Sequence, residues 1–79
     1  MSYQVEVLYT LAQMQNPNNS HRIILKTFDN STEAQNYFNS INSKNINKEI
    51  ISMGKEIDQW LDFDSRFLCI TQMNQKKKL

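Results

Sequence analysis

The sequence predicts an α+β fold: a two-layer ββααβ domain in which a helical pair covers one face of a three-stranded antiparallel sheet. Three observations lead to this prediction. Apolar and polar residues alternate with period two over 3–14, and strand-like runs cover 21–28 and 66–73. Two apolar stripes of helical spacing lie between 30 and 61. We expect the sheet order 2-1-3, because it keeps the longest strand central.

The first strand is expected over Tyr3–Met14. Its odd positions are apolar or aromatic as far as Leu11, whereas Gln4, Glu6 and Thr10 are polar. The run is rich in β-branched and aromatic residues, which favour strands. It is longer than the usual ~5–6 residues, as expected of a strand with a neighbour on both sides.

A hairpin loop and a second strand follow. Asn and Ser residues with Pro17 predict the loop over 15–20. Strict alternation would then divide the strand over 21–28 between two faces. One face would carry Ile23, Leu25 and Thr27, and the other would carry Arg22, Ile24, Lys26 and Phe28.

The first helix is predicted to start at Asn30, with Glu33 three residues later in a pattern resembling a capping box; Asp29 or Ser31 are alternative caps. It should run to about Ser43. Asn and Ser residues over 42–45 compete for backbone hydrogen bonds and predict a break there. Its apolar stripe consists of Ala34, Tyr37, Phe38 and Ile41.

A second helix is predicted from spacings of four and three residues. Gly54 would cost this helix roughly 1 kcal/mol relative to Ala. A strand over Glu49–Met53 that ends at Gly54 is the competing interpretation. The stripe consists of Ile46, Ile50, Met53, Ile57 and Trp60.

Length and charge limit the organisation and the environment. We expect one domain over 1–75 and a basic disordered tail over 76–79. The formal charge is +1, but without Lys76–Lys78 it is −2, which argues against a duplex-binding domain. No apolar run approaches the ~20 residues of a membrane span. Cys69 is the only cysteine, so a disulfide within the chain is excluded, and we expect a cytoplasmic protein.

We expect no catalytic, cofactor-binding or metal site, and no enzyme. His21 has no nucleophile or orienting group nearby in sequence and is interpreted as a surface residue. Cys69 lies among apolar residues, where a thiol is inert. The carboxylates over 56–64 lack the glycine of a Ca²⁺ loop, and Gly54 alone cannot form a phosphate-binding loop.

The leading hypothesis is a small non-enzymatic protein–protein interaction module. It would use the bare sheet face, or the edge of strand two or three, to form a homodimer or to bind another protein. A phage or mobile-element inhibitor or adaptor of a host or defence complex is one specific form. Trp60 is interpreted either as an interface residue or as plain core. The bare face is expected to carry Leu8, Ala12, Met14, Ile24, Phe28 and one side of the third strand. The candidate partner-binding residues are Trp60, Phe63, Asp58, Asp62, Asp64, Ile24 and Phe28.

Nucleic-acid binding is the alternative. It would use Arg22, Lys26, Arg66 and the Lys76–Lys78 tail, and it predicts binding that falls steeply with salt. The mild acidity of the remaining chain makes it the second choice. A small-ligand or metal sensor ranks third.

Overall fold

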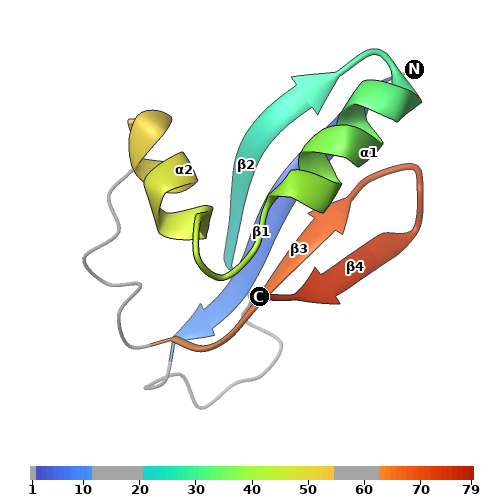
Figure 1. Ribbon diagram of the computed structural model, residues 1–79. Coiled ribbons are helices and arrows are strands. Elements are labelled where there is room, and N and C mark those ends of the chain that lie inside the picture. Colours follow the sequence, from blue (N-terminus) through green and yellow to red (C-terminus); the bar gives the residue numbers. More distant parts are fainter. Residues whose placement is uncertain (1, 12–20, 55–62) are drawn as a thin grey trace.

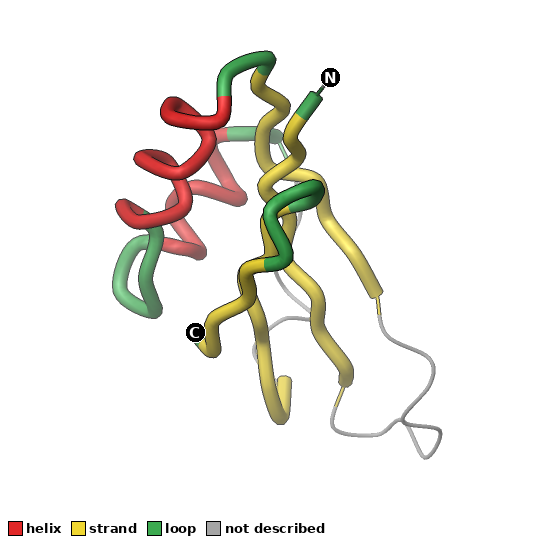
Figure 2. Tube along the Cα trace, turned by 90° about the vertical axis from the view of Figure 1, so that its right-hand side faces the viewer, coloured by secondary structure: helices red, strands yellow, loops and turns green. Residues whose placement is uncertain are grey.

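The computed structural model describes residues 2–11, 21–54 and 63–79, except for the side chains of 10, 11 and 63–65. Within these ranges it shows an α+β fold, a four-stranded antiparallel sheet with both helices on one face (Figure 1 and Figure 2). The predicted class is confirmed, with one strand more than expected. The elements are β1 (Tyr3–Leu11), β2 (His21–Phe28), α1 (Ser31–Ser40), α2 (Ile46–Ser52), β3 (Phe63–Ile70) and β4 (Gln75–Lys78).

The long first strand lies inside the sheet, as its length suggested. The order is β2-β1-β3-β4 and every pairing is antiparallel, so the predicted 2-1-3 order forms part of the observed one. β1 runs from Tyr3 to Leu11. Its expected continuation over 12–14 and the hairpin loop over 15–20 lie outside the described residues.

The last residues form a strand, so the expected disordered tail over 76–79 is wrong. Lys78 lies opposite Phe67 and Lys76 lies opposite Cys69, which makes β4 the edge of the sheet beside β3. The composition of 75–78 did not indicate a strand, because a run of lysines is unfavourable within a sheet. At an edge, however, charged side chains remain in water and discourage pairing with other chains.

A turn over 71–74 brings β4 back along β3. Gln72 and Asn74 adopt positive φ, of 69° and 50°, which lets the chain reverse direction. β3 therefore ends at Ile70 instead of at the predicted Met73. The chain end is held too, since the Leu79 backbone N–H donates a 2.8 Å hydrogen bond to a β3 carbonyl.

The predicted N-cap of the first helix is confirmed. Asn30 Oδ1 accepts hydrogen bonds from the backbone N–H groups of Thr32 (2.7 Å) and Glu33 (3.1 Å). α1 ends at Ser40, three residues earlier than expected. The asparagine-rich break lies where it was predicted, and its side chains bond to the backbone: Asn45 Oδ1 accepts from Asn42 N at 2.7 Å.

The second helix ends at Ser52, so the competing strand over Glu49–Met53 is wrong. Gly54 lies beyond the helix, with φ of +74°, and its N–H donates to the Ile51 carbonyl at 2.9 Å. It therefore ends α2 in a left-handed conformation that suits glycine, where the sequence placed it inside the helix. The rest of the predicted stripe, 57–60, lies outside the described residues.

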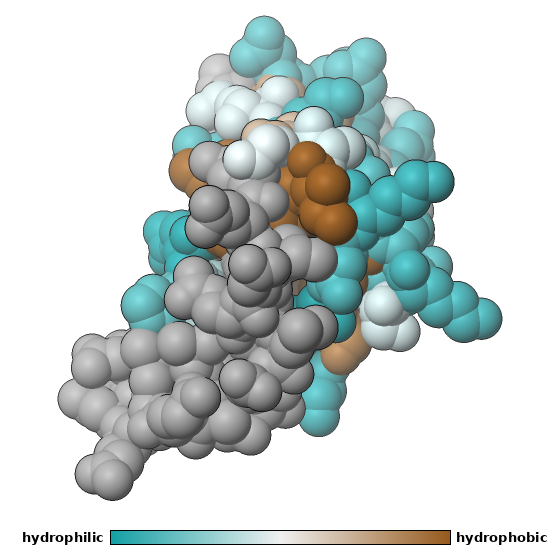
Figure 3. All heavy atoms as spheres, turned by 90° about the vertical axis from the view of Figure 1, so that its left-hand side faces the viewer, coloured by the Kyte–Doolittle hydropathy of each residue, from teal (hydrophilic) through white to brown (hydrophobic). Residues whose placement is uncertain are grey.

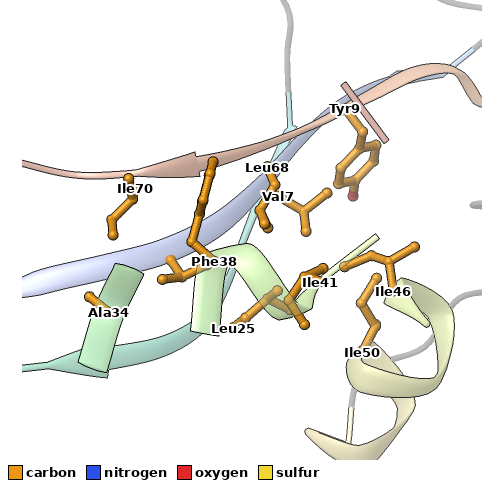
Figure 4. Packing of buried hydrophobic residues seen from close by; sticks show 11 residues of the cluster. Val7, Tyr9, Leu25, Ala34, Phe38, Ile41, Ile46, Ile50, Leu68 and Ile70 are labelled. Carbon is orange, nitrogen blue, oxygen red and sulfur yellow. The ribbon is translucent and has the colours of Figure 1, made fainter. Parts of the chain in front are cut away.

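One hydrophobic core fills the space between the helices and the sheet (Figure 4). The alternation in β1 works as predicted, because Val5, Val7 and Tyr9 all point into this core. The helical stripes supply the opposite side. The buried members are Val5, Val7, Tyr9, Leu25, Ala34, Phe38, Ile41, Ile46, Ile50, Leu68 and Ile70.

Candidate docking face

A bulge in β2 decides which of its side chains face the helices. Val5 pairs with Lys26 but the next residue, Glu6, pairs with Ile24, so Leu25 is an extra residue in the strand. Strict alternation therefore fails at this point. Residues after the bulge lie on the opposite face from the one that the sequence predicted.

Phe28 is the main correction. It was expected on the bare sheet face, but it packs against the core beside Tyr37 of α1, with the ring centroids 5.5 Å apart. Lys26 follows it to the helix side, where its Nζ lies 5.5 Å from the Phe28 ring centroid. Leu25, just before them, remains buried in the core. The bulge thus removes one aromatic ring from the candidate surface.

On the face of the sheet opposite the helices, eight side chains in two adjacent rows form the area that we call the open face. Cross-strand partners share a face, so the rows follow from the register. Each row runs from β2 through β1 and β3 to β4. The rows are Ile24, Glu6, Cys69 and Lys76, and then Arg22, Leu8, Phe67 and Lys78.

The middle of the open face is largely apolar. Leu8, Phe67 and Cys69 are half-buried, and Ile24 is 45% exposed. Both described helices lie on the other side of the sheet (Figure 2). Leu8 and Ile24 therefore lie, as predicted, on the face opposite α1 and α2, whereas Ala12 and Met14 lie outside the described residues.

Glu6 is a carboxylate almost withdrawn from water in the middle of this face. The residue is 3% exposed, and Oε1 lies 3.4 Å from Arg22 Nε. Oε2 is buried and has no hydrogen-bond partner in the described part of the chain. Burial of an unpartnered carboxylate oxygen is costly, so stability alone does not explain an acid here.

Two further groups of the open face, the Lys76 ammonium and the Cys69 thiol, lie beside its apolar residues. Lys76 Nζ lies 4.5 Å from the Phe67 ring centroid, a cation–π distance. Burial raises the pKa of the Cys69 thiol; Lys76 and Arg22 act against that rise, and Glu6 adds to it. The thiol is therefore protonated at neutral pH.

The cations proposed for nucleic-acid binding do not form one surface. Arg22 lies on the open face, but Lys26 lies on the helix side beside Phe28. Arg66 also lies on the helix side, where its Nη1 donates to Asn47 Oδ1 of α2 and burial lowers its pKa. Among the β4 lysines, Lys77 reaches the Phe38 carbonyl oxygen of α1.

Several predicted partner-binding residues cannot be placed. Trp60, Asp58 and Asp62 lie outside the described residues. Phe63 and Asp64 are the first two residues of β3, but their side chains lie outside the described part. Sequence reasoning missed Glu6, Phe67 and the β4 lysines as parts of one surface. The alternation of β1 was the available signal, since it places Glu6 beside Leu8.

Other candidate chemistry is sparse in the described ranges. His21 is exposed and stacks on Tyr9, with the ring centroids 5.3 Å apart. No group of three or more His, Cys, Asp or Glu residues within 2–11, 21–54 and 63–79 could hold a metal ion. No helix in this part of the chain is long and apolar enough to cross a membrane.

A second apolar area lies at the end of α2. Ile51 is 55% exposed and Met53 is 37% exposed. Figure 3 views the molecule from the α2 side and shows brown, hydrophobic surface there. We assign no role to this area.

Comparison with protein families, with curated proteins and with solved structures finds no match for this chain. The function must therefore be argued from the geometry of the open face.

Proposed function

We propose that this protein is a small non-enzymatic protein-interaction module that binds another protein through its open face. The observation that carries the proposal is apolar surface that neither described helix covers: Leu8, Ile24 and Phe67 lie on the side of the sheet away from α1 and α2. Apolar surface bordered by polar groups is typical of protein-binding sites.

The sheet face is a better binding surface than either sheet edge. β4 is a short edge of four residues with three lysines, and β2 is distorted by the bulge at Leu25. Both features oppose the addition of another strand. The edge of β3, an alternative in the sequence prediction, is already paired with β4.

The charges on the open face favour an acidic partner. Arg22, Lys76 and Lys78 are exposed at its two borders, and Glu6 is the one acid among the eight residues. Two copies that met face to face would bring these cations together, which is unfavourable. We therefore place another protein on the open face. The homodimer expected from the sequence remains a prediction, and light scattering at micromolar concentration tests it.

The specific form that we propose is a cytoplasmic inhibitor or adaptor of a host or defence complex, of the kind that phages and mobile elements encode. It is supported by the absence of catalytic motifs from the sequence and by the abundance of Asn, Lys and Ile, which AT-rich codons specify.

Nucleic-acid binding is the second candidate. Arg22, Lys76 and Lys78 on one face favour it, because cations attract phosphates. It is weaker than protein binding because Phe67 is the one aromatic side chain among the eight and Lys76 lies over its ring. Platforms for single strands usually stack several bases on aromatic rings.

A capture experiment with matched variants tests the proposal. The full chain is immobilised as wild type, as Ile24→Glu on the open face and as Ile51→Glu on α2, since both isoleucines are about half exposed. Circular dichroism confirms that each variant is folded. We expect a protein from nuclease-treated lysate to be retained by wild type and Ile51→Glu but lost with Ile24→Glu.

Two outcomes would contradict protein binding through this face. One is that no captured protein distinguishes Ile24→Glu from Ile51→Glu. The other is that the selective capture occurs only from lysate that has not been treated with nuclease, which would favour the nucleic-acid candidate.

A further inference from the structure

The open face is an apolar strip between two cationic borders. Leu8 on β1 and Phe67 on β3 form the strip, while Arg22 on β2 and Lys76 and Lys78 on β4 form the borders. Neighbouring strands lie about 4.8 Å apart, so the backbones of the two border strands are roughly 14 Å apart. The separation of the two borders therefore limits the width of a partner segment that lies on the strip.

This width suits an α-helix laid along the strands. A helix with its side chains is about 10–12 Å across, slightly less than the separation of the borders. Along β1 the two rows of the open face, at Glu6 and Leu8, are about 7 Å apart, which corresponds to roughly five helical residues at a rise of 1.5 Å. An added strand would need a free edge, and both edges of this sheet oppose pairing.

The cations lie at both borders, where they can contact carboxylates on both sides of such a helix. Glu6 Oε1 lies 3.4 Å from Arg22 Nε, while the Arg22 side chain remains 62% exposed. The guanidinium is thus oriented before binding and can receive a carboxylate through two parallel hydrogen bonds. Lys76 and Lys78 supply positive charge on the opposite border, where both are exposed.

We infer that the partner places on the open face an amphipathic helix whose apolar stripe is flanked on both sides by Asp or Glu. This inference rests on the proposed function and specifies its partner. Apolar residues at i and i+3 or i+4 pack against Leu8 and Phe67. Carboxylates on one flank pair with Arg22, and those on the other pair with Lys76 and Lys78.

Two synthetic peptides test the inference. Both carry the same leucine stripe at helical spacing, one with glutamates on both flanks and one with lysines, and each has a fluorescent label. Anisotropy at low salt measures their affinity for the full-length protein. We expect the glutamate peptide to bind at least about tenfold more tightly and to lose affinity as salt rises. It should shift backbone amide resonances in β1, β3 and β4 more than those in the helices.

Charge reversal supplies the matched controls. The Lys76→Glu/Lys78→Glu variant should bind the glutamate peptide about tenfold more weakly than the wild type, or weaker still. Lys48→Glu, an exposed position on α2, should leave its affinity unchanged. Ile24→Glu should also weaken it, because it places an acid beside the strip.

Absent binding, equal binding of the two peptides or resonance shifts confined to α1 and α2 would overturn the inference. So would tighter binding of a single-stranded oligonucleotide to the same face. If the capture experiment still distinguishes Ile24→Glu from Ile51→Glu, the docking function stands and the acidic helix is wrong. If that experiment also fails, both are wrong.

Discussion

Lys77 Nζ donates a 2.8 Å hydrogen bond to the carbonyl oxygen of Phe38, in the last turn of α1. The same nitrogen lies 4.8 Å from the Phe38 ring centroid. The last strand is therefore tied to the helix layer by a charged donor at the negative end of a helix dipole. A residue that composition assigns to a solvated tail thus contributes to the tertiary structure.

Replacement of this lysine should destabilise the protein. Lys77→Met keeps an apolar stem but leaves the Phe38 carbonyl without its donor, and we expect the free energy of unfolding to fall by about 1 kcal/mol. Lys78→Met is the matched control, since Lys78 is exposed on the open face and should change stability by less than about 0.5 kcal/mol. Urea denaturation measures both variants. Equal effects would show that Lys77 acts only through net charge.

A hydrogen bond between α1 and α2 should make the free energy of unfolding depend on pH in the alkaline range. The Tyr37 hydroxyl donates a 2.7 Å hydrogen bond to Glu49 Oε1. Burial, this hydrogen bond and the Glu49 charge raise the Tyr37 pKa above its usual value of 10.0. Above pH 10 the unfolded chain releases the Tyr37 proton while the folded chain retains it, so the free energy of unfolding falls as pH rises.

Tyr37→Phe isolates this contribution. It should lower the free energy of unfolding by about 1 kcal/mol near neutral pH through loss of the hydrogen bond. Its stability should fall less steeply than that of the wild type above pH 10, where the raised pKa values of Tyr9 and Cys69 still act in both proteins. Urea denaturation between pH 8 and 11 measures the two slopes. Parallel slopes would contradict the assignment to Tyr37.

The buried acid of the open face should reduce stability. Glu6→Met removes a carboxylate whose Oε2 is unpartnered in the described structure, and we expect the free energy of unfolding to rise by on the order of 1 kcal/mol. Arg22→Met should lower it by a similar amount, because the carboxylate then loses its counter-ion. Thermal unfolding at pH 7 compares the variants. A marked loss of stability in Glu6→Met would show that the ion pair outweighs the burial of the charge.

The end of α2 should require glycine. Gly54 has φ of +74° and a Cβ there would meet no atom within 4 Å, so the cost of a substitution arises from the backbone conformation and not from a clash. Gly54→Ala should lower the free energy of unfolding by about 1 kcal/mol. Gly54→Asn should cost less, because asparagine tolerates this conformation. Equal losses in the two variants, measured by urea denaturation, would argue against a backbone origin.

Much of the secondary structure is predictable because its signals are local. The alternation of β1 placed Val5 and Val7 in the core, and the Asn30 cap marked the start of α1. The same period of two assigned Leu8 and Ile24 to the face opposite α1 and α2. Such signals depend on one residue and its near neighbours in the chain, so they can be read without knowledge of the fold.

The composition of the open face depends instead on how the strands meet. The bulge at Leu25 moves Phe28 to the helix side, and β4 brings Lys76 and Lys78 beside Phe67. Neither result follows from periodicity or charge, because strand register and edge pairing are set by hydrogen bonds between segments far apart in sequence. Local patterns thus predicted the first three strands, both helices and much of the core, whereas pairing across the sheet determined which side chains share the surface available to a partner.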